Sequence, residues 1–200
     1  MLQNFLRRTA PVCVAILLST GCQTVKSAQT GMQTPPPETH AVPLRFASHD
    51  FEAFCYNTLS CSVTYNNHQF TRAAIGTRSP PPPSSDYRKS WPHALYLGIE
   101  NFPAPAEVRW TSLDGVRHQA DVDIAAIFKD QLIWHEVPES DMADFYRGPV
   151  AGEPDIFLEV NDRTINVYTK MFIPTKTEQI VGNKDSNFRD DLFLVWTDNY

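Results

Sequence analysis

Apolar and polar residues alternate most strictly on the two sides of an Asp-Gly pair in the middle of the chain. Residues 106–111 and 116–122 place an apolar or His side chain at every second position, with polar or charged side chains between them. A period of two is typical of a strand with one buried face, and Asp114-Gly115 suits a hairpin turn. The pattern predicts a hairpin that covers a core on one side only.

Further strands are predicted on both sides of this hairpin. Residues 156–160 and 165–168 alternate around the turn at 161–163, and the apolar run 192–196 predicts a buried terminal strand. The remaining strand patterns are a β-rich block over 44–75 with a turn at 66–68, a strand at 93–99, and weaker strands at Ile173 and 178–181.

Two short segments change to a helical period. Ile124, Ile127 and Phe128 are spaced i, i+3, i+4, and Asp123 is placed as an N-cap. A second helical turn is predicted over 140–146, before Gly148-Pro149. The fold class is therefore predicted as mainly β (α+β), with antiparallel, sandwich-like sheets and one or two short helices.

The first 21 residues have the pattern of a signal peptide. Arg7-Arg8 precede an apolar run that is about half as long as a spanning helix. Residues 17–22 resemble a bacterial lipobox, which implies that Cys22 becomes the acylated first mature residue. The alternative to a signal peptide is that the apolar run forms a buried N-terminal helix. By resemblance to enterobacterial sorting rules, Gln23 favours a lipid anchor in the outer membrane, with the domain facing the periplasm.

The mature chain divides into a tether and one domain. Residues 22–43 are rich in Pro, Ser and Thr and have few large apolar side chains, so they are expected to be an extended spacer. Residues 44–200 form a single β-rich domain. The proline run within 79–85 is predicted to be a surface loop, with a polyproline ligand as the alternative.

Cys55 and Cys61 are the two cysteines left within the domain. A pair in a secreted protein predicts a disulfide. The alternatives are two free thiols and a metal site that uses both cysteines. Zinc sites usually have four ligands; His68 is the nearest candidate for a third ligand, and no candidate for a fourth stands out.

The charge of the chain argues against a nucleic-acid partner. Among its 200 residues the net charge is −6, and removal of residues 1–21 takes away two basic residues and no acidic one, giving −8. A nucleic-acid-binding protein would need a basic stripe. An acidic body is not held at an anionic leaflet by charge, so membrane attachment would depend on the lipid at Cys22.

No sequence motif for catalysis is present. The chain has no Gly-x-Ser-x-Gly elbow, P-loop or zincin motif, and its six His residues are dispersed. His118 is the exception to check, because it lies on the apolar face of its strand. We therefore expect no enzyme, no cofactor and no metal site; a hydrolase would need a Ser/His or Asp/His pair within hydrogen-bond reach.

A protein-binding epitope is predicted in the acidic stretch between Trp134 and Asp155. Acidic residues outnumber the single basic one there, and aromatic residues lie among them. The residues expected to bind a partner are Trp134, Asp141, Asp144, Phe145, Tyr146 and Arg147. The alternative is that the aromatic residues belong to the core and the acids are merely solvated.

Three segments, 105–113, 122–128 and 156–168, resemble a family of small Gram-negative envelope lipoproteins of unassigned activity. Some members resemble immunity proteins that pair with phospholipase toxins of type VI secretion. The resemblance implies a membrane-anchored lipoprotein that neutralises a secreted lipase effector without catalysis. The alternatives are an accessory envelope lipoprotein, such as a secretion or assembly factor, and a small-ligand binder.

Overall fold

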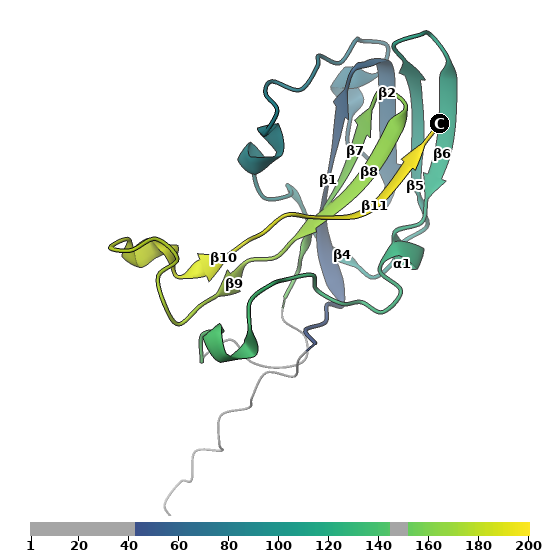
Figure 1. Ribbon diagram of the computed structural model, residues 1–200. Coiled ribbons are helices and arrows are strands. Elements are labelled where there is room, and N and C mark those ends of the chain that lie inside the picture. Colours follow the sequence, from purple (N-terminus) through teal and green to yellow (C-terminus); the bar gives the residue numbers. More distant parts are fainter. Residues whose placement is uncertain (1–42, 145–151) are drawn as a thin grey trace, which may run out of the picture. The chain divides into compact units, whose positions relative to one another are not determined.

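The computed structural model describes residues 43–144 and 152–200 (Figure 1). The predicted signal peptide and most of the predicted tether, including Cys22, lie outside the described residues. So do Phe145, Tyr146 and Arg147. No helix in the described ranges is long and apolar enough to cross a membrane.

A five-stranded sheet forms one layer of the domain. Its strand order is β11-β8-β7-β1-β4, and the strands are β1 (Ser48–Tyr56), β4 (Tyr96–Glu100), β7 (Asp155–Asn161), β8 (Thr164–Lys170) and β11 (Phe193–Asn199). All its neighbouring pairs are antiparallel except β1 and β7, which run parallel. The expectation of antiparallel pairing was wrong for that pair. Parallel strands need a long connection, and the intervening residues include the whole second sheet.

The second layer is a four-stranded antiparallel sheet. Its order is β3-β2-β5-β6, with β2 at Thr58–Tyr65, β3 at His68–Gln69, β5 at Ala106–Ser112 and β6 at Arg117–Val122. The predicted hairpin is confirmed, since Ala106 pairs with Val122 and Thr111 with Arg117. The turn between β2 and β3 is also confirmed, with Asn66 and Asn67 at φ 47° and 59°.

The main core lies between the two sheets, which confirms the sandwich-like fold. Alternate residues of the central strands are fully buried and meet in one cluster, among them Phe51, Val63, Val108, Leu158 and Val167. Each strand turns one row of side chains inward because successive residues point to opposite faces.

A segment ahead of β4 covers the outer face of the five-stranded sheet. Tyr87, Trp91 and Ala94 form a second buried cluster with Phe157 and Tyr168. Residues 79–85 contain neither helix nor strand, as predicted, and the 3₁₀ turn η2 (Tyr87–Ser90) follows. We call residues 79–94 the strap. Because of it, β7 and β8 are buried on both faces.

The short helices agree with prediction in part. Helix α1 (Ile124–Ile127) is capped by Asp123, whose carboxylate accepts a hydrogen bond from the Ala126 amide, as predicted. The turn expected over 140–146 is instead the 3₁₀ turn η3 (Glu139–Asp141), which ends because Met142 becomes extended and pairs with Thr175. The other 3₁₀ turns are η1 (Arg72–Ala74) and η4 (Lys184–Ser186).

Three strand predictions need correction. The strand expected over 93–99 begins only at Tyr96, because the Asp155 carboxylate accepts a hydrogen bond from the Ala94 amide. Residues 178–181 are irregular and form no strand, and Val181 is fully exposed. Ile173 lies in β9 (Ile173–Pro174), which pairs with β10 (Phe188–Arg189). The terminal strand is not buried: β11 is an edge strand, and Leu194 is 51% exposed.

The predicted disulfide is confirmed. Cys55 in β1 is bonded to Cys61 in β2, with the two Cα atoms 6.3 Å apart. Since β1 and β2 belong to different sheets, the bond ties the two layers together at the corner where the chain passes from one to the other.

Candidate functional site

Trp134 stands at an open groove beside α1. The hollow has a volume of about 460 Å³ and is lined mainly by apolar side chains from α1, the segment after it and the start of β11, including Ile127, Leu132, Trp134 and Phe193. The Trp134 and Phe193 rings are 6.5 Å apart, and Trp134 is 48% exposed. An exposed tryptophan beside a hollow is a common anchor of protein interfaces.

The segment after α1 is fixed by backbone hydrogen bonds to the start of the domain. The Phe46 amide donates to Gln131, and the Ile133 amide donates to Leu44. Ile133 and Val137 then point into the core, which leaves Trp134 outward. His135 is half-buried at the same groove, and burial lowers its pKa, which favours the neutral imidazole.

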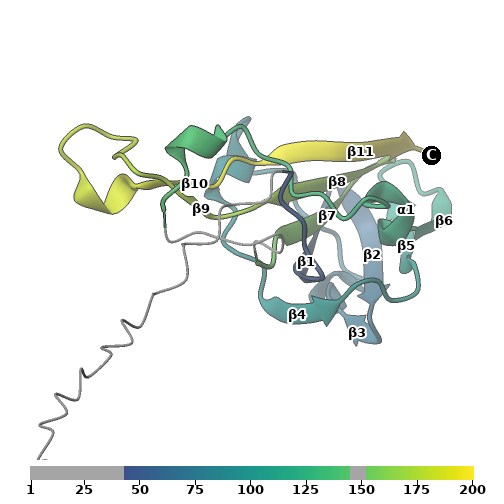
Figure 2. The same ribbon diagram turned by 90° about the horizontal axis from the view of Figure 1, so that it is seen from below.

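A second hollow continues the first along β11. It has a volume of about 300 Å³ and shares Ile127 with the first, and its other lining residues include Asp121, Asp123 and Trp196. We call the two hollows together the β11 groove. In the sheet, β11 pairs with β8 on one side only, so its other edge is unpaired within the described part of the chain. Figure 2 shows β11 at the margin of the domain beside β8, with α1 near its C-terminal half.

Carboxylates outnumber cations around the β11 groove. Asp121, Asp123 and Asp130 line it, with Lys129 as the one cation among the lining residues. Close by, Arg189 is held between Glu136 at 3.3 Å and Asp191 at 2.5 Å, so its charge is already compensated. The groove is therefore acidic and apolar at once.

The structure only partly assembles the predicted epitope. Asp141 and Asp144 are exposed on and after η3, but neither lines the groove, and Asp144 forms an ion pair with Lys176 at 3.2 Å. The acids at the far end of the predicted stretch lie elsewhere: Glu153 bonds to Ser48, and Asp155 is buried beneath the strap.

Sequence reasoning missed Phe193, Trp196 and Ile127 as groove residues. The run 192–196 was interpreted as a buried strand because it is continuously apolar. Polar residues follow it directly at Thr197, Asp198 and Asn199. Such a change within one strand is typical of an edge position, and it was the available signal.

One Ser/His pair lies within hydrogen-bond reach, as a hydrolase would require. The Ser112 Oγ and His118 Nε2 atoms are 2.9 Å apart, and Asp114 is adjacent. However, Asp114 bonds to Ser112 and Arg163 rather than to His118, and Ser112 has no exposed surface. His118 stacks on Trp110 with ring centroids 4.9 Å apart. This arrangement fixes the hairpin turn and lacks a base oriented by a carboxylate.

A His/Asp pair occurs at the strap. His93 Nδ1 lies 2.8 Å from the Asp155 carboxylate, but within the described ranges no hydroxyl or thiol bonds to His93. The part of the chain that the structure describes contains no group of three or more His, Cys, Asp or Glu side chains arranged to hold a metal ion.

Comparisons of the chain with protein-family models, with curated proteins and with solved structures find no significant match. The geometry defines the class of site: an acidic, aromatic groove along an edge strand of the sheet.

Proposed function

We propose that this protein is a non-catalytic binding module that docks a protein partner in the β11 groove. The observation that carries the proposal is the position of half-exposed Trp134 next to Phe193, at the start of the edge strand β11. An unpaired edge offers backbone donors and acceptors, and the groove next to it offers apolar contact.

The occupant that fits best is an extended segment of a basic protein. Such a segment would add a strand to β11 and place every second side chain in the groove between Trp134 and Trp196. The carboxylates of Asp121, Asp123 and Asp130 would attract its cations and speed association.

We further propose that the partner is a secreted phospholipase toxin, and that binding neutralises it by occlusion. This step depends on the resemblance to envelope lipoproteins described above. With Cys22 acylated, the module would be tethered to the outer membrane and would face the periplasm, where a toxin attacking that membrane would be met. Inhibition then needs an interface of about 1,600 Å² and no chemistry of its own.

The test is protection of cells that produce a periplasmic phospholipase toxin. The full chain is compared with a Trp134→Ala/Phe193→Ala variant. Loss of an interface anchor costs about 2 kcal/mol or more, so we expect toxin affinity to fall about 30-fold or more and survival to fall with it. Because Trp134 is half-exposed and Phe193 is only partly buried, the thermal midpoint should change little.

A Leu95→Ala/Leu97→Ala variant is the matched control. These side chains are 78% and 67% exposed next to and within β4, at the opposite edge of the same sheet. This control variant should protect cells as well as the unmodified chain does. Full protection by a folded groove variant would refute the docking site, and binding of an envelope assembly protein instead of any toxin would favour the accessory role.

A further inference from the structure

The outer face of the four-stranded sheet is hollowed, and most of the side chains that line the hollow carry hydrogen-bond donors. The hollow has a volume of about 440 Å³. The side chains that point outward into it come from three strands, and we call them the arginine face: Ser60, Ser62, Arg109, Thr111, Arg117 and Gln119. The strap covers the other sheet and leaves this face open.

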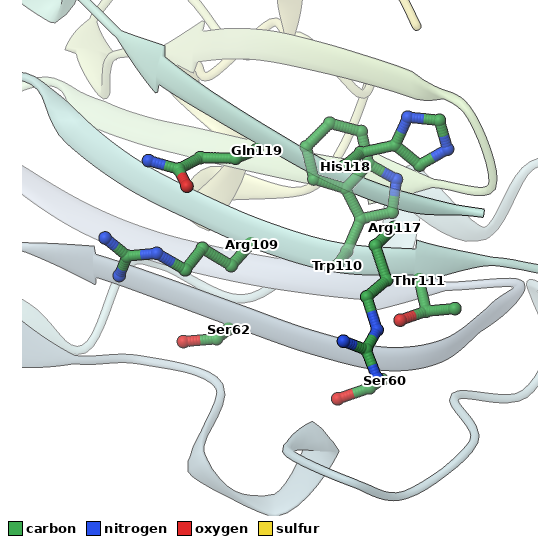
Figure 3. A pocket seen from close by; sticks show the side chains of 8 residues that line it. All are labelled: Ser60, Ser62, Arg109, Trp110, Thr111, Arg117, His118 and Gln119. Carbon is green, nitrogen blue, oxygen red and sulfur yellow. The ribbon is translucent and has the colours of Figure 1, made fainter. Parts of the chain in front are cut away.

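Strand pairing places these six residues in two rows. Ser60, Thr111 and Arg117 lie opposite one another across β2, β5 and β6, and Ser62, Arg109 and Gln119 form the next row on the same face. Figure 3 shows the Arg117 guanidinium directed toward Ser60. Trp110 and His118 also line the hollow, although they belong to the inward-pointing set of their strands.

Both serine hydroxyls remain able to donate. The Ser60 Oγ accepts a hydrogen bond from the Gly76 amide at 2.8 Å, and the Ser62 Oγ accepts one from Gln69 at 2.7 Å. Each oxygen is thus used as an acceptor, so its proton is free for a ligand. This arrangement orients donors toward the hollow without a protein acceptor for them.

The two guanidinium groups are incompletely paired. Arg117 makes no side-chain hydrogen bond or ion pair within the described residues, and Arg109 pairs only with Glu107, at 2.9 Å on the rim. No carboxylate lines the hollow, although the whole chain has a net charge of −6. Two arginine side chains line one hollow of a chain with a negative net charge, although Figure 3 shows their guanidinium groups directed to different parts of it. Local positive charge of this kind favours an anionic ligand.

We propose that the arginine face binds a phosphate group, presented either by a phospholipid headgroup or by a soluble phosphate. Arginine matches the tetrahedral oxygens of phosphate with paired N–H donors, and hydroxyl and amide groups complete the shell. The hollow is open and lined mainly by polar side chains, which suits a compact charged group. This site is distinct from the β11 groove and does not depend on it.

The probes are inorganic phosphate and lipid vesicles, tested on the full chain carrying Cys22→Ser so that no acyl anchor interferes. Calorimetric titration with phosphate should give saturable, millimolar binding. Vesicles of phosphatidylglycerol in phosphatidylcholine should retain the protein better than phosphatidylcholine alone if the headgroup is the source. Phosphate binding without vesicle retention would assign a soluble ligand.

Substitutions separate this site from general charge effects. Arg109→Gln and Arg117→Gln should each weaken phosphate binding about tenfold or more, since each removes a charge-assisted hydrogen bond. Glu107→Gln should strengthen it severalfold by releasing Arg109, a gain that a structural role would not produce. Arg78→Gln, an exposed arginine outside the face, is the matched control.

Three results would overturn the proposal. These are no saturable phosphate binding to the folded protein, binding that survives the double Arg109→Gln/Arg117→Gln variant, and binding of an acidic peptide with no competition by phosphate. Variants of the arginine face that lose phosphate binding should still protect against the toxin. A negative result for phosphate binding can therefore be distinguished from a negative result for docking at the β11 groove.

Discussion

His49 is a titratable side chain with no exposed surface, held between two polar neighbours in the core. Its Nδ1 lies 2.8 Å from Asn101 Oδ1, and its Nε2 lies 3.1 Å from the Tyr65 hydroxyl. The rings of Phe46 and Phe102 pack around it. Burial lowers the pKa of His49 below its ordinary value of 6.5, against smaller opposing effects of Asn101 and Glu153.

This shift predicts loss of stability below about pH 6.5. The unfolded chain takes up a proton on His49 as the pH falls through 6.5, whereas the native state does not, so the free energy of unfolding decreases. The effect of one such group is at most about 1.4 kcal/mol per pH unit. Denaturant unfolding between pH 7.5 and 5.5 should show a steeper decline for the unmodified chain than for His49→Gln.

Parallel pH profiles for the two proteins would contradict this assignment. His135 is a second group with a pKa lowered by burial, so the variant should retain part of the slope. The contribution of Asp50 to the pH dependence has the opposite sign. Burial raises its pKa, so a fall in pH toward that pKa increases the free energy of unfolding.

At the scale of elements, the strap is held to the sheet by buried polar contacts as well as by aromatic packing. Glu159 in β7 is fully buried and accepts hydrogen bonds from the Tyr87 hydroxyl, from Arg88 at 2.7 Å and from Asn166 at 2.9 Å. Burial and the neighbouring Glu159 charge raise the pKa of Tyr168 to about 12. Because the Glu159 carboxylate accepts hydrogen bonds from Tyr87 and Arg88, it holds the strap in one position on the sheet.

Glu159→Ala should therefore destabilise the domain and loosen the strap. It leaves Arg88 and Asn166 without their acceptor, at a cost of about 2 kcal/mol; the cost is moderate because the Arg88 side chain is 31% exposed. Chemical unfolding gives the change, and hydrogen exchange at the Ala94 amide reports the strap. Glu100→Ala, an exposed acid in β4, should be close to neutral. Equal stability of the two variants would show that aromatic packing alone holds the strap.

For the molecule as a whole, the proposed function depends on attachment at Cys22. Acyl chains contribute about 0.8 kcal/mol per buried CH₂, so several chains on one thiol hold a protein durably, while an acidic body adds no attraction to an anionic leaflet. The proposed phosphate site could add a weak local contact at such a surface, but not an anchor.

Cys22→Ser should move the protein from the membrane fraction to the soluble fraction and abolish metabolic palmitate labelling. Cys13→Ser is the matched control, because Cys13 lies within the predicted signal peptide and should be dispensable for both. Protection against a periplasmic toxin should weaken in the Cys22→Ser variant alone. Unchanged labelling and fractionation of that variant would rule out the lipid anchor.

Much of the fold follows from local pattern. The hairpin around Asp114-Gly115, the hairpin of β7 and β8, the capped turn after Asp123 and the Cys55–Cys61 bond were all predicted from the sequence. These features depend on residues close in the chain, where period, turn chemistry and capping act directly. Among the predicted partner-binding residues that the structure describes, only Trp134 lines the β11 groove.

What the chain determined by itself is its alternation, its turns and its acidic, mainly-β character, because these are properties of neighbouring residues. The tertiary structure decided that β1 and β7 run parallel, that the strap covers one sheet, and that β11 is an edge beside Trp134. Trp134 and Phe193 are 59 residues apart in the sequence, and the paired residues of β1 and β7 are 105 apart. Burial between distant segments depends on which faces meet, and no local pattern encodes that choice.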